Sequence, residues 1–182
     1  MMGDDLRHRA TPILLALASG IILFLTGCQS ATVNAKLPAI PSSQLNPYRG
    51  QIKDLMPSQV GEYKLDNRQS LAETGVEMTN TVDGAGGIYN TPSNHTVQHL
   101  LVNFASAADA NKELDNDLKR YQQGRQNPIL EDVKDAAGQK SGRKITVKDG
   151  KTEALSWTNG SLFCSVVSYT GYSSEFAGNL PY

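Results

Sequence analysis

The hydrophobic and polar positions divide the chain into three parts. A largely apolar run without charged residues covers residues 13–25, a stretch of small and polar residues with three prolines covers residues 29–47, and a mixed pattern typical of folded domains begins at Tyr48. The apolar run is several residues shorter than the roughly 20 that a membrane-spanning helix needs. Because basic residues precede the run and small residues follow it, we expect a cleavable secretory signal peptide.

The clearest helical pattern covers residues 107–123. Ser106 offers a hydroxyl N-cap, Asp109 places a carboxylate three residues later, and Gly124 supplies a left-handed stop. Apolar residues recur at helical spacing at Ala107, Ala110, Leu114, Leu118 and Tyr121. We therefore predict one amphipathic helix whose apolar stripe covers a sheet. Its acidic residues are expected to face solvent, and they are Asp109, Glu113, Asp115 and Asp117.

Strand patterns precede this helix. Residues 52–56 can form one helical turn, residues 60–65 alternate as in a first strand, and residues 76–82 suggest a second extended stretch. A glycine cluster at residues 83–87 interrupts that stretch and reads as a turn or as a place of tight packing. Residues 96–104 are rich in strand-forming side chains and predict a further strand.

Three more strands are predicted after the helix, over residues 144–148, 153–158 and 162–169. They are joined at Asp149-Gly150 and Asn159-Gly160, two dipeptides that accept the positive φ angles of a type I′ turn. Two-residue turns lead directly from one strand to the next, so a three-stranded antiparallel meander is expected.

The turns also predict which side chains share a face of the meander. Both faces are apolar, so either a helix covers each of them or a bulge shifts the register. The candidate helices cover residues 107–123 and 174–180. Residues 126–142 read as a loop or a ragged strand. The predicted pairs are Trp157 with Leu162 and Leu155 with Cys164 on one face, and Ala154 with Ile145 and Ser165 on the other.

These patterns together predict an α+β fold. We expect an antiparallel sheet with a C-terminal three-stranded meander, packed by one amphipathic helix and a short C-terminal helix.

The end of the apolar run carries the most specific motif in the chain. Leu25-Thr26-Gly27-Cys28 resembles the lipobox of bacterial lipoproteins, in which small residues admit the signal peptidase and the cysteine thiol receives a diacylglycerol. The resemblance implies that Cys28 is the lipid attachment residue. Two or three acyl chains would hold the protein firmly, because each buried CH₂ contributes about 0.8 kcal/mol.

The lipobox and the residue pattern that follows it together divide the chain into three regions. Residues 1–27 form the signal peptide, residues 28–47 the lipidated cysteine with a flexible linker, and residues 48–182 a single α+β domain. In polyproline II geometry the linker reaches up to roughly 60 Å from the membrane. Gln29 follows the cysteine, and the absence of aspartate there implies the outer membrane, facing the periplasm, if the organism is Gram-negative.

Charge and cysteine content limit the partners and the covalent structure. The formal net charge is −1, and cleavage removes two acidic and two basic residues, so no basic field attracts nucleic acid. With Cys28 acylated, Cys164 has no partner for a disulfide and is expected to be buried and inert.

No motif identifies catalytic, cofactor-binding or metal-ligating residues. The glycine cluster lacks the Lys-Ser/Thr pair of a phosphate-binding loop. In a strand, His95 and His99 would lie about 13 Å apart along one face, too far apart to bind one metal ion. Tyr172 and Tyr182 either pack against the domain or form a platform for a ligand.

Three functions remain open. The first is a lipid-anchored, non-catalytic binding or assembly module with a cell-envelope protein as its partner. The second is an extracytoplasmic, hydrolase-like enzyme whose catalytic residues converge only in space. The third is an accessory subunit of a membrane complex, comparable at the level of fold with small α+β lipoproteins of the PsbP type, although the sequence carries no distinctive motif of that family.

Overall fold

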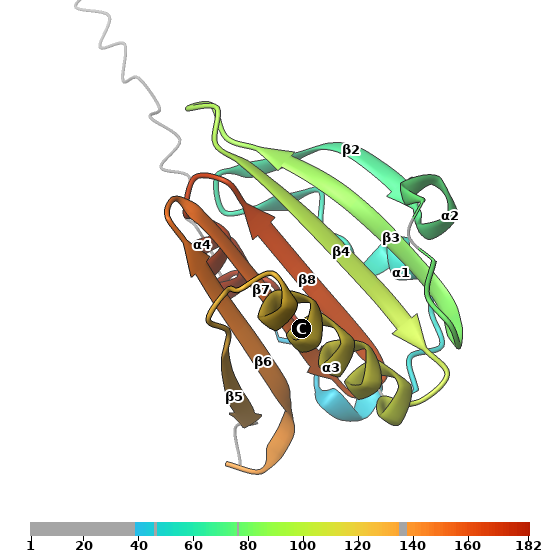
Figure 1. Cartoon of the computed structure of the whole chain (residues 1–182). Helices are drawn as coiled ribbons and strands as arrows, with labels where there is room; N and C mark the ends of the chain where they lie inside the picture. The colour runs from blue at the N-terminus through green and yellow to red at the C-terminus, as the bar shows by residue number, and fades with distance from the viewer. Residues whose placement is uncertain (1–38, 46, 76, 135–137) are drawn as a thin grey trace, which may run out of the picture. The chain divides into compact units, whose positions relative to one another are not determined.

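The computed structural model describes residues 39–45, 47–75, 77–134 and 138–182 (Figure 1). The predicted signal peptide and the predicted lipid attachment at Cys28 lie outside the described residues.

The described residues form an α+β fold built on one antiparallel sheet of eight strands in the order β1-β2-β3-β4-β8-β7-β6-β5. The prediction of an α+β fold is therefore confirmed. The strands are β1 (Gln59–Val60), β2 (Tyr63–Ser70), β3 (Thr81–Asn90), β4 (Thr96–Phe104), β5 (Ile129–Lys134), β6 (Lys140–Asp149), β7 (Thr152–Asn159) and β8 (Leu162–Ser168). The helices are α1 (Ile52–Leu55), α2 (Leu71–Thr74), α3 (Ala107–Gln123) and α4 (Ser173–Gly178), preceded by the 3-10 turn η1 (Ser42–Gln44).

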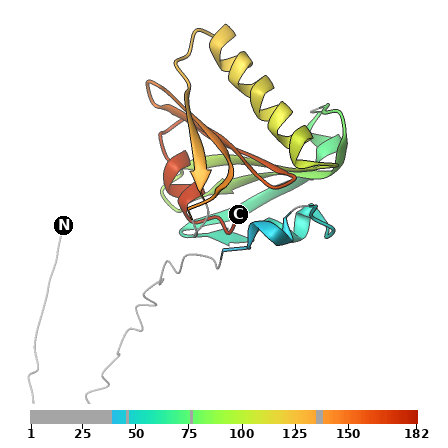
Figure 2. The same ribbon diagram turned by 90° about the horizontal axis from the view of Figure 1, so that it is seen from below.

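The sheet carries one apolar cluster on each face, because successive strand residues point to opposite sides. On one face, Ile52 of α1 and Phe176 of α4 pack against strand residues such as Tyr89. We call this the α1–α4 face. On the other, Ala110 and Leu114 of α3 pack against residues of β4, β6, β7 and β8, and we call this the α3 face. Figure 2 shows α3 above the sheet and α1 below it.

The strands β6, β7 and β8 are consecutive neighbours, but their register differs by two residues from the predicted one. Gly150 and Gly160, with φ of 58° and 60°, take the first central position of each turn, as in type II′ hairpins, instead of the second. A shift of two residues leaves every side chain on its predicted face. The observed pairs are Trp157 with Cys164, Leu155 with Val166, Ala154 with Val147 and Val167, and Ser156 with Ile145 and Ser165.

The glycine cluster is not a turn, because Gly84, Gly86 and Gly87 lie inside the continuous strand β3. Its second interpretation, tight packing, holds. A Cβ at Gly86 would come within 2.9 Å of the Thr74 methyl group in α2, and one at Gly87 within 2.8 Å of the Met56 methyl group. The missing side chain of Gly86 lets α2 lie directly on the α3 face of β3, and that of Gly87 makes room for Met56 on the α1–α4 face.

Helix α3 begins as predicted and ends differently. Ser106 Oγ accepts a hydrogen bond from the backbone N–H of Asp109, which is the predicted N-cap. The left-handed residue at the C-terminal end is Arg125, with φ of 59°, whereas Gly124 has φ of −71°. The prediction that Gly124 adopts the left-handed conformation was therefore wrong.

The segment before the sheet packs into the domain. Leu45 is fully buried, and its carbonyl accepts hydrogen bonds from the backbone N–H and the hydroxyl of Ser161. Ile40 donates its N–H to the carbonyl of Pro181 at 2.7 Å. The part of the predicted linker that the structure describes, residues 39–45, is therefore fastened to the domain.

Two further segments differ in detail from what the sequence predicts. The polar stretch after α3 contains the regular edge strand β5, in which Ile129 and Leu130 are exposed. The predicted extended stretch over residues 76–82 is a strand only from Thr81 onward.

Candidate functional site

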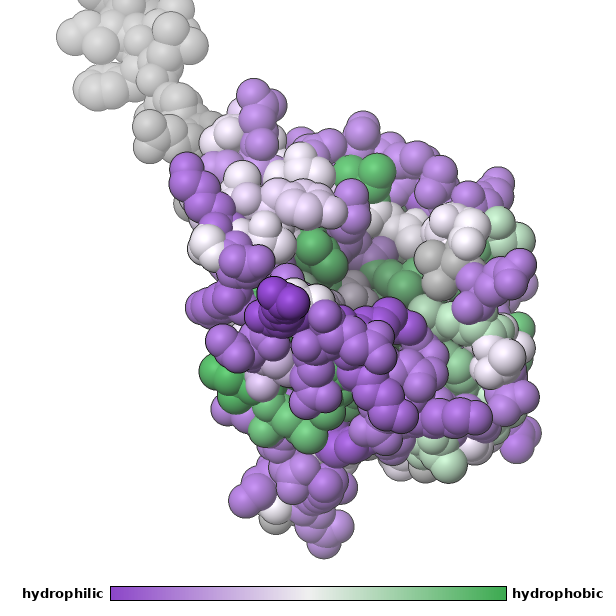
Figure 3. Space-filling model, in the orientation of Figure 1, coloured by the Kyte–Doolittle hydropathy of each residue, from purple (hydrophilic) through white to green (hydrophobic). Residues whose placement is uncertain are grey.

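Part of the α3 face is left open between helices α2 and α3. The uncovered surface belongs to β2, β3, β4 and β8, and it surrounds a hollow of 320 Å³. Figure 3 shows this hollow near the centre of the face, with hydrophobic atoms at its bottom and hydrophilic atoms around it.

The ladder of the sheet arranges the floor of the hollow in two rows that run across the strands. One row consists of Asn67, Ile88, Gln98 and Val167, and the next of Gln69, Gly86, Leu100 and Ser165. Residues two apart on a strand share a face, so both rows point toward the same side. A bulge in β2 between Leu65 and Asn67 turns Asn67 and Gln69 to this side.

Three side-chain amides stand in these rows, those of Asn67, Gln69 and Gln98. All three side chains are exposed, and within the described part of the chain none of them has a hydrogen-bond partner. Each amide therefore has two N–H donors and a carbonyl acceptor available to a bound molecule. Between them, Ile88 and Leu100 are half-buried and form the apolar floor.

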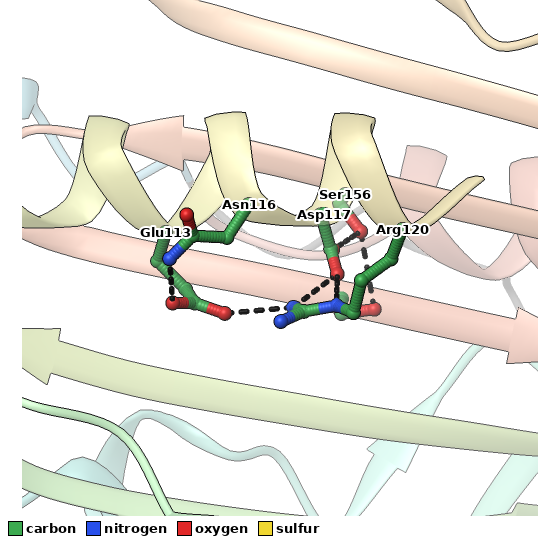
Figure 4. A network of polar contacts seen from close by, with 6 residues as sticks. Glu113, Asn116, Asp117, Arg120 and Ser156 are labelled. Carbon is green, nitrogen blue, oxygen red and sulfur yellow. Dashed lines mark hydrogen bonds and ion pairs between the residues drawn. The ribbon is translucent and has the colours of Figure 1, made fainter. Parts of the chain in front are cut away.

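A network of charged and hydroxyl groups on helix α3 and on strands β7 and β8 lies beside this hollow (Figure 4), and its charged residues line the neighbouring hollow. Arg120 Nη2 donates to Glu113 Oε1 at 2.7 Å and to Asp117 Oδ1 at 2.5 Å. Ser156 Oγ donates to the second oxygen of Asp117 at 2.6 Å and lies 3.2 Å from Ser165 Oγ. The network thus joins the helix to the middle of β7 and β8.

The network contradicts the expectation of a solvated acidic face. Glu113 and Asp117 are buried, whereas the Arg120 side chain remains 55% exposed. Burial opposes the charge on Arg120, but the hydrogen bonds and negative charges of the two carboxylates outweigh it and raise the pKa of the guanidinium. Glu113 and Asp117 therefore hold a charged guanidinium at the rim of the hollow.

Two neighbouring hollows extend the site. One of 280 Å³ lies beside Arg120 and shares Leu100 and Ser165 with the first hollow. A wider one of 740 Å³ beside α2 shares Glu77 and Met78 with the second. We refer to the three connected hollows as the α2–α3 groove.

The histidines and tyrosines singled out in the sequence turn their rings away from this groove, although His99 is one of the residues that line the first hollow. The His99 ring packs in the α1–α4 face, where it stacks on Tyr182 and contacts Phe176 edge to face. Burial lowers the pKa of His99 to about 3, so the ring is neutral. His95 stacks on Tyr172 with ring centroids 4.0 Å apart. Tyr172 and Tyr182 thus pack against histidines.

Cys164 is fully buried beside Trp157, and burial raises the pKa of its thiol well above the ordinary value. This thiol is held in its protonated form, as expected for an inert cysteine. Among the described residues, no group of three or more histidine, cysteine, aspartate or glutamate side chains is placed to hold a metal ion. No helix in the described ranges is long and apolar enough to span a membrane.

Sequence reasoning did not find the α2–α3 groove. Its side chains come mainly from four strands and two helices, and their proximity depends on β4 pairing with β8, whose partners are 59 to 69 residues apart in the chain. The one local signal was the spacing of Asn67 and Gln69 by two residues, which places two amides on one face of a strand.

No protein-family model matches the chain, and neither does the sequence of any curated protein. The crystal structure of a GTP binding regulator from Thermotoga maritima is similar, with a TM-score of 0.45 and 15% sequence identity over 78% of this chain and 84% of that chain. A likeness of this degree carries no argument about the function of this protein.

Proposed function

We propose that this protein is a lipid-anchored extracytoplasmic lipoprotein whose domain is a non-catalytic binding or assembly module. The anchor rests on the lipobox-like sequence at residues 25–28, with Cys28 as the lipid attachment site. In a Gram-negative cell the lipid would lie in the outer membrane and the domain in the periplasm. Its partner would be a protein of the cell envelope.

The observation that supports a binding role is the α2–α3 groove. It is open, it offers the free amides of Asn67, Gln69 and Gln98, and its floor is apolar, which is the combination that binding sites use for affinity and orientation. The buried groups with strongly shifted pKa values, Cys164 and His99, belong to the α1–α4 face instead. Their location favours binding over catalysis at the groove.

The proposal also includes the predicted packing of the C-terminal meander by two helices. In it, the C-terminal meander packed by the amphipathic helix α3 and the short helix α4 is the rigid scaffold, and the groove beside α3 is the surface that it presents. Because the meander strands β7 and β8 hold Ser156 and Ser165 against Asp117, the scaffold fixes one wall of the groove.

The anchor is tested by metabolic labelling with palmitate and by membrane fractionation of the full chain. We expect Cys28→Ser to abolish labelling and to release the protein into the soluble fraction. The matched control is Cys164→Ala, which removes the buried cysteine and is expected to leave labelling and membrane association unchanged. Retention of label and of membrane association in Cys28→Ser would contradict the proposal.

A further inference from the structure

We propose that the α2–α3 groove binds an extended polypeptide segment in which basic and aliphatic side chains alternate. The inference rests on the binding role proposed above and identifies the kind of partner. Three properties of the groove carry it: the spacing of its free amides, the sign of its charge and the apolar floor between them.

The spacing of the amides matches an extended chain. Asn67 and Gln98 stand in the same row with Ile88 of β3 between them, so they lie two strands, or roughly 10 Å, apart. Three residues of an extended peptide cover the same distance. A side-chain amide offers the same donor and acceptor as a peptide group, so the two amides can bond to the backbone of one bound strand.

The charge of the groove is negative. Glu77, Asp83, Glu113 and Asp117 line it against the single guanidinium of Arg120, which leaves a formal charge of −3, whereas the whole chain carries −1. A further hollow, lined by Lys53 and Arg68, shares Asp83 with the groove. There Arg68 donates to the backbone carbonyl of Met56, toward the α1–α4 face. Since the charges of the lining do not cancel, the groove attracts cationic side chains and repels acidic ones.

The apolar floor of the groove is the reason for expecting aliphatic residues at every second position of the bound peptide. Ile88, Leu100 and Met78 are half-buried apolar side chains of the lining. In an extended peptide successive side chains point to opposite sides, so aliphatic residues can enter the floor while lysines reach the acidic wall. Phe163, the one aromatic side chain of the lining, is 1% exposed and offers no stacking surface for a sugar ring.

The test uses the full lipidated protein in nanodiscs of zwitterionic lipid, with empty nanodiscs as the blank. A fluorescein-labelled, terminally blocked octapeptide of alternating lysine and valine is titrated at low and high salt, beside a matched peptide of glutamate and valine. We expect saturable anisotropy for the lysine peptide, weakening as salt rises, and no saturation for the glutamate peptide.

Two variants test whether the lysine peptide binds in the groove. Gln98→Arg removes an amide and adds a positive charge on an exposed residue of the groove, and it should weaken binding about tenfold. Asn127→Arg adds the same charge on an exposed residue outside the lining and should leave affinity within about twofold. Any one of four results would overturn the inference. These results are no saturable binding, equal affinity for both peptides, equal effects of the two variants, and displacement of the lysine peptide by the sugar chitotetraose. Retention of label and of membrane association in Cys28→Ser would overturn the proposed anchor while leaving the peptide-binding result intact.

Discussion

Ser156 Oγ donates a hydrogen bond of 2.6 Å to Asp117 Oδ2, joining the centre of strand β7 to helix α3 in the interior of the protein. The same carboxylate accepts from Arg120, so one side chain satisfies a buried hydroxyl and positions a guanidinium at the groove. Buried polar groups of this kind are costly when one partner is removed, because the other loses its hydrogen bond without regaining water.

Asp117→Ala should lower the free energy of unfolding by about 1–3 kcal/mol, because it leaves Ser156 and Glu113 with an incomplete network. The matched control is Asp115→Ala on the same helix, whose side chain is 48% exposed and pairs with Arg143. That change should cost less than about 1 kcal/mol. Urea denaturation of both variants measures the difference, and equal stabilities would contradict the buried network.

Two glycines that look alike in sequence should respond oppositely to alanine. A Cβ on Gly142 would collide with the backbone carbonyl of Thr158, whereas one on Gly178 meets open space. We expect Gly142→Ala to destabilise the protein by about 1–3 kcal/mol or more and Gly178→Ala to be neutral or slightly stabilising. Thermal melts of the two variants test this, and an unchanged melting temperature in Gly142→Ala would mean that β6 and β7 are packed less closely.

A substitution at Leu45 tests whether residues 39–45 of the predicted linker belong to the folded domain. Its side chain is fully buried, so Leu45→Ala should lower stability by about 2–4 kcal/mol. Ile129→Ala removes an aliphatic side chain that is 59% exposed and should change stability by less than about 0.5 kcal/mol. If the two variants unfold at the same urea concentration, residues 39–45 do not belong to the core.

His99 predicts a pH dependence of stability. Its pKa is lowered to about 3 in the folded state, against an ordinary value of 6.5, so the unfolded chain binds the proton more tightly. Stability is therefore fully present above pH 6.5 and falls as the pH drops toward 3, by up to about 1.4 kcal/mol per pH unit.

The window between pH 6.5 and 5 isolates this effect, because the carboxylates with lowered pKa values titrate below it. Urea denaturation in that window should show a slope in the unaltered protein and in His95→Gln, and a flatter profile in His99→Gln. A slope that persists in His99→Gln would assign the proton uptake to another group.

Local signals in the sequence predicted most helices and strands but did not predict the α2–α3 groove. The cap at Ser106 and the apolar alternation around Trp157 depend on residues near in sequence, and both are found in the structure. The glycine cluster of β3 predicted either a turn or tight packing, and the choice between them depends on the close approach of α2 to Gly84 and Gly86, which arises only in the folded chain. Glu113 and Asp117 were placed in solvent for a similar reason, since Ser156 lies on a distant strand.

The central claim is that the domain is presented from a lipid on Cys28. Its most direct measurement is the intact mass, with fragment sequencing, of the mature protein extracted from membranes. We predict a chain that begins at Cys28 and carries a diacylglyceryl group on that residue. A mature protein that begins at another residue, or that carries a free thiol at Cys28, would contradict the account.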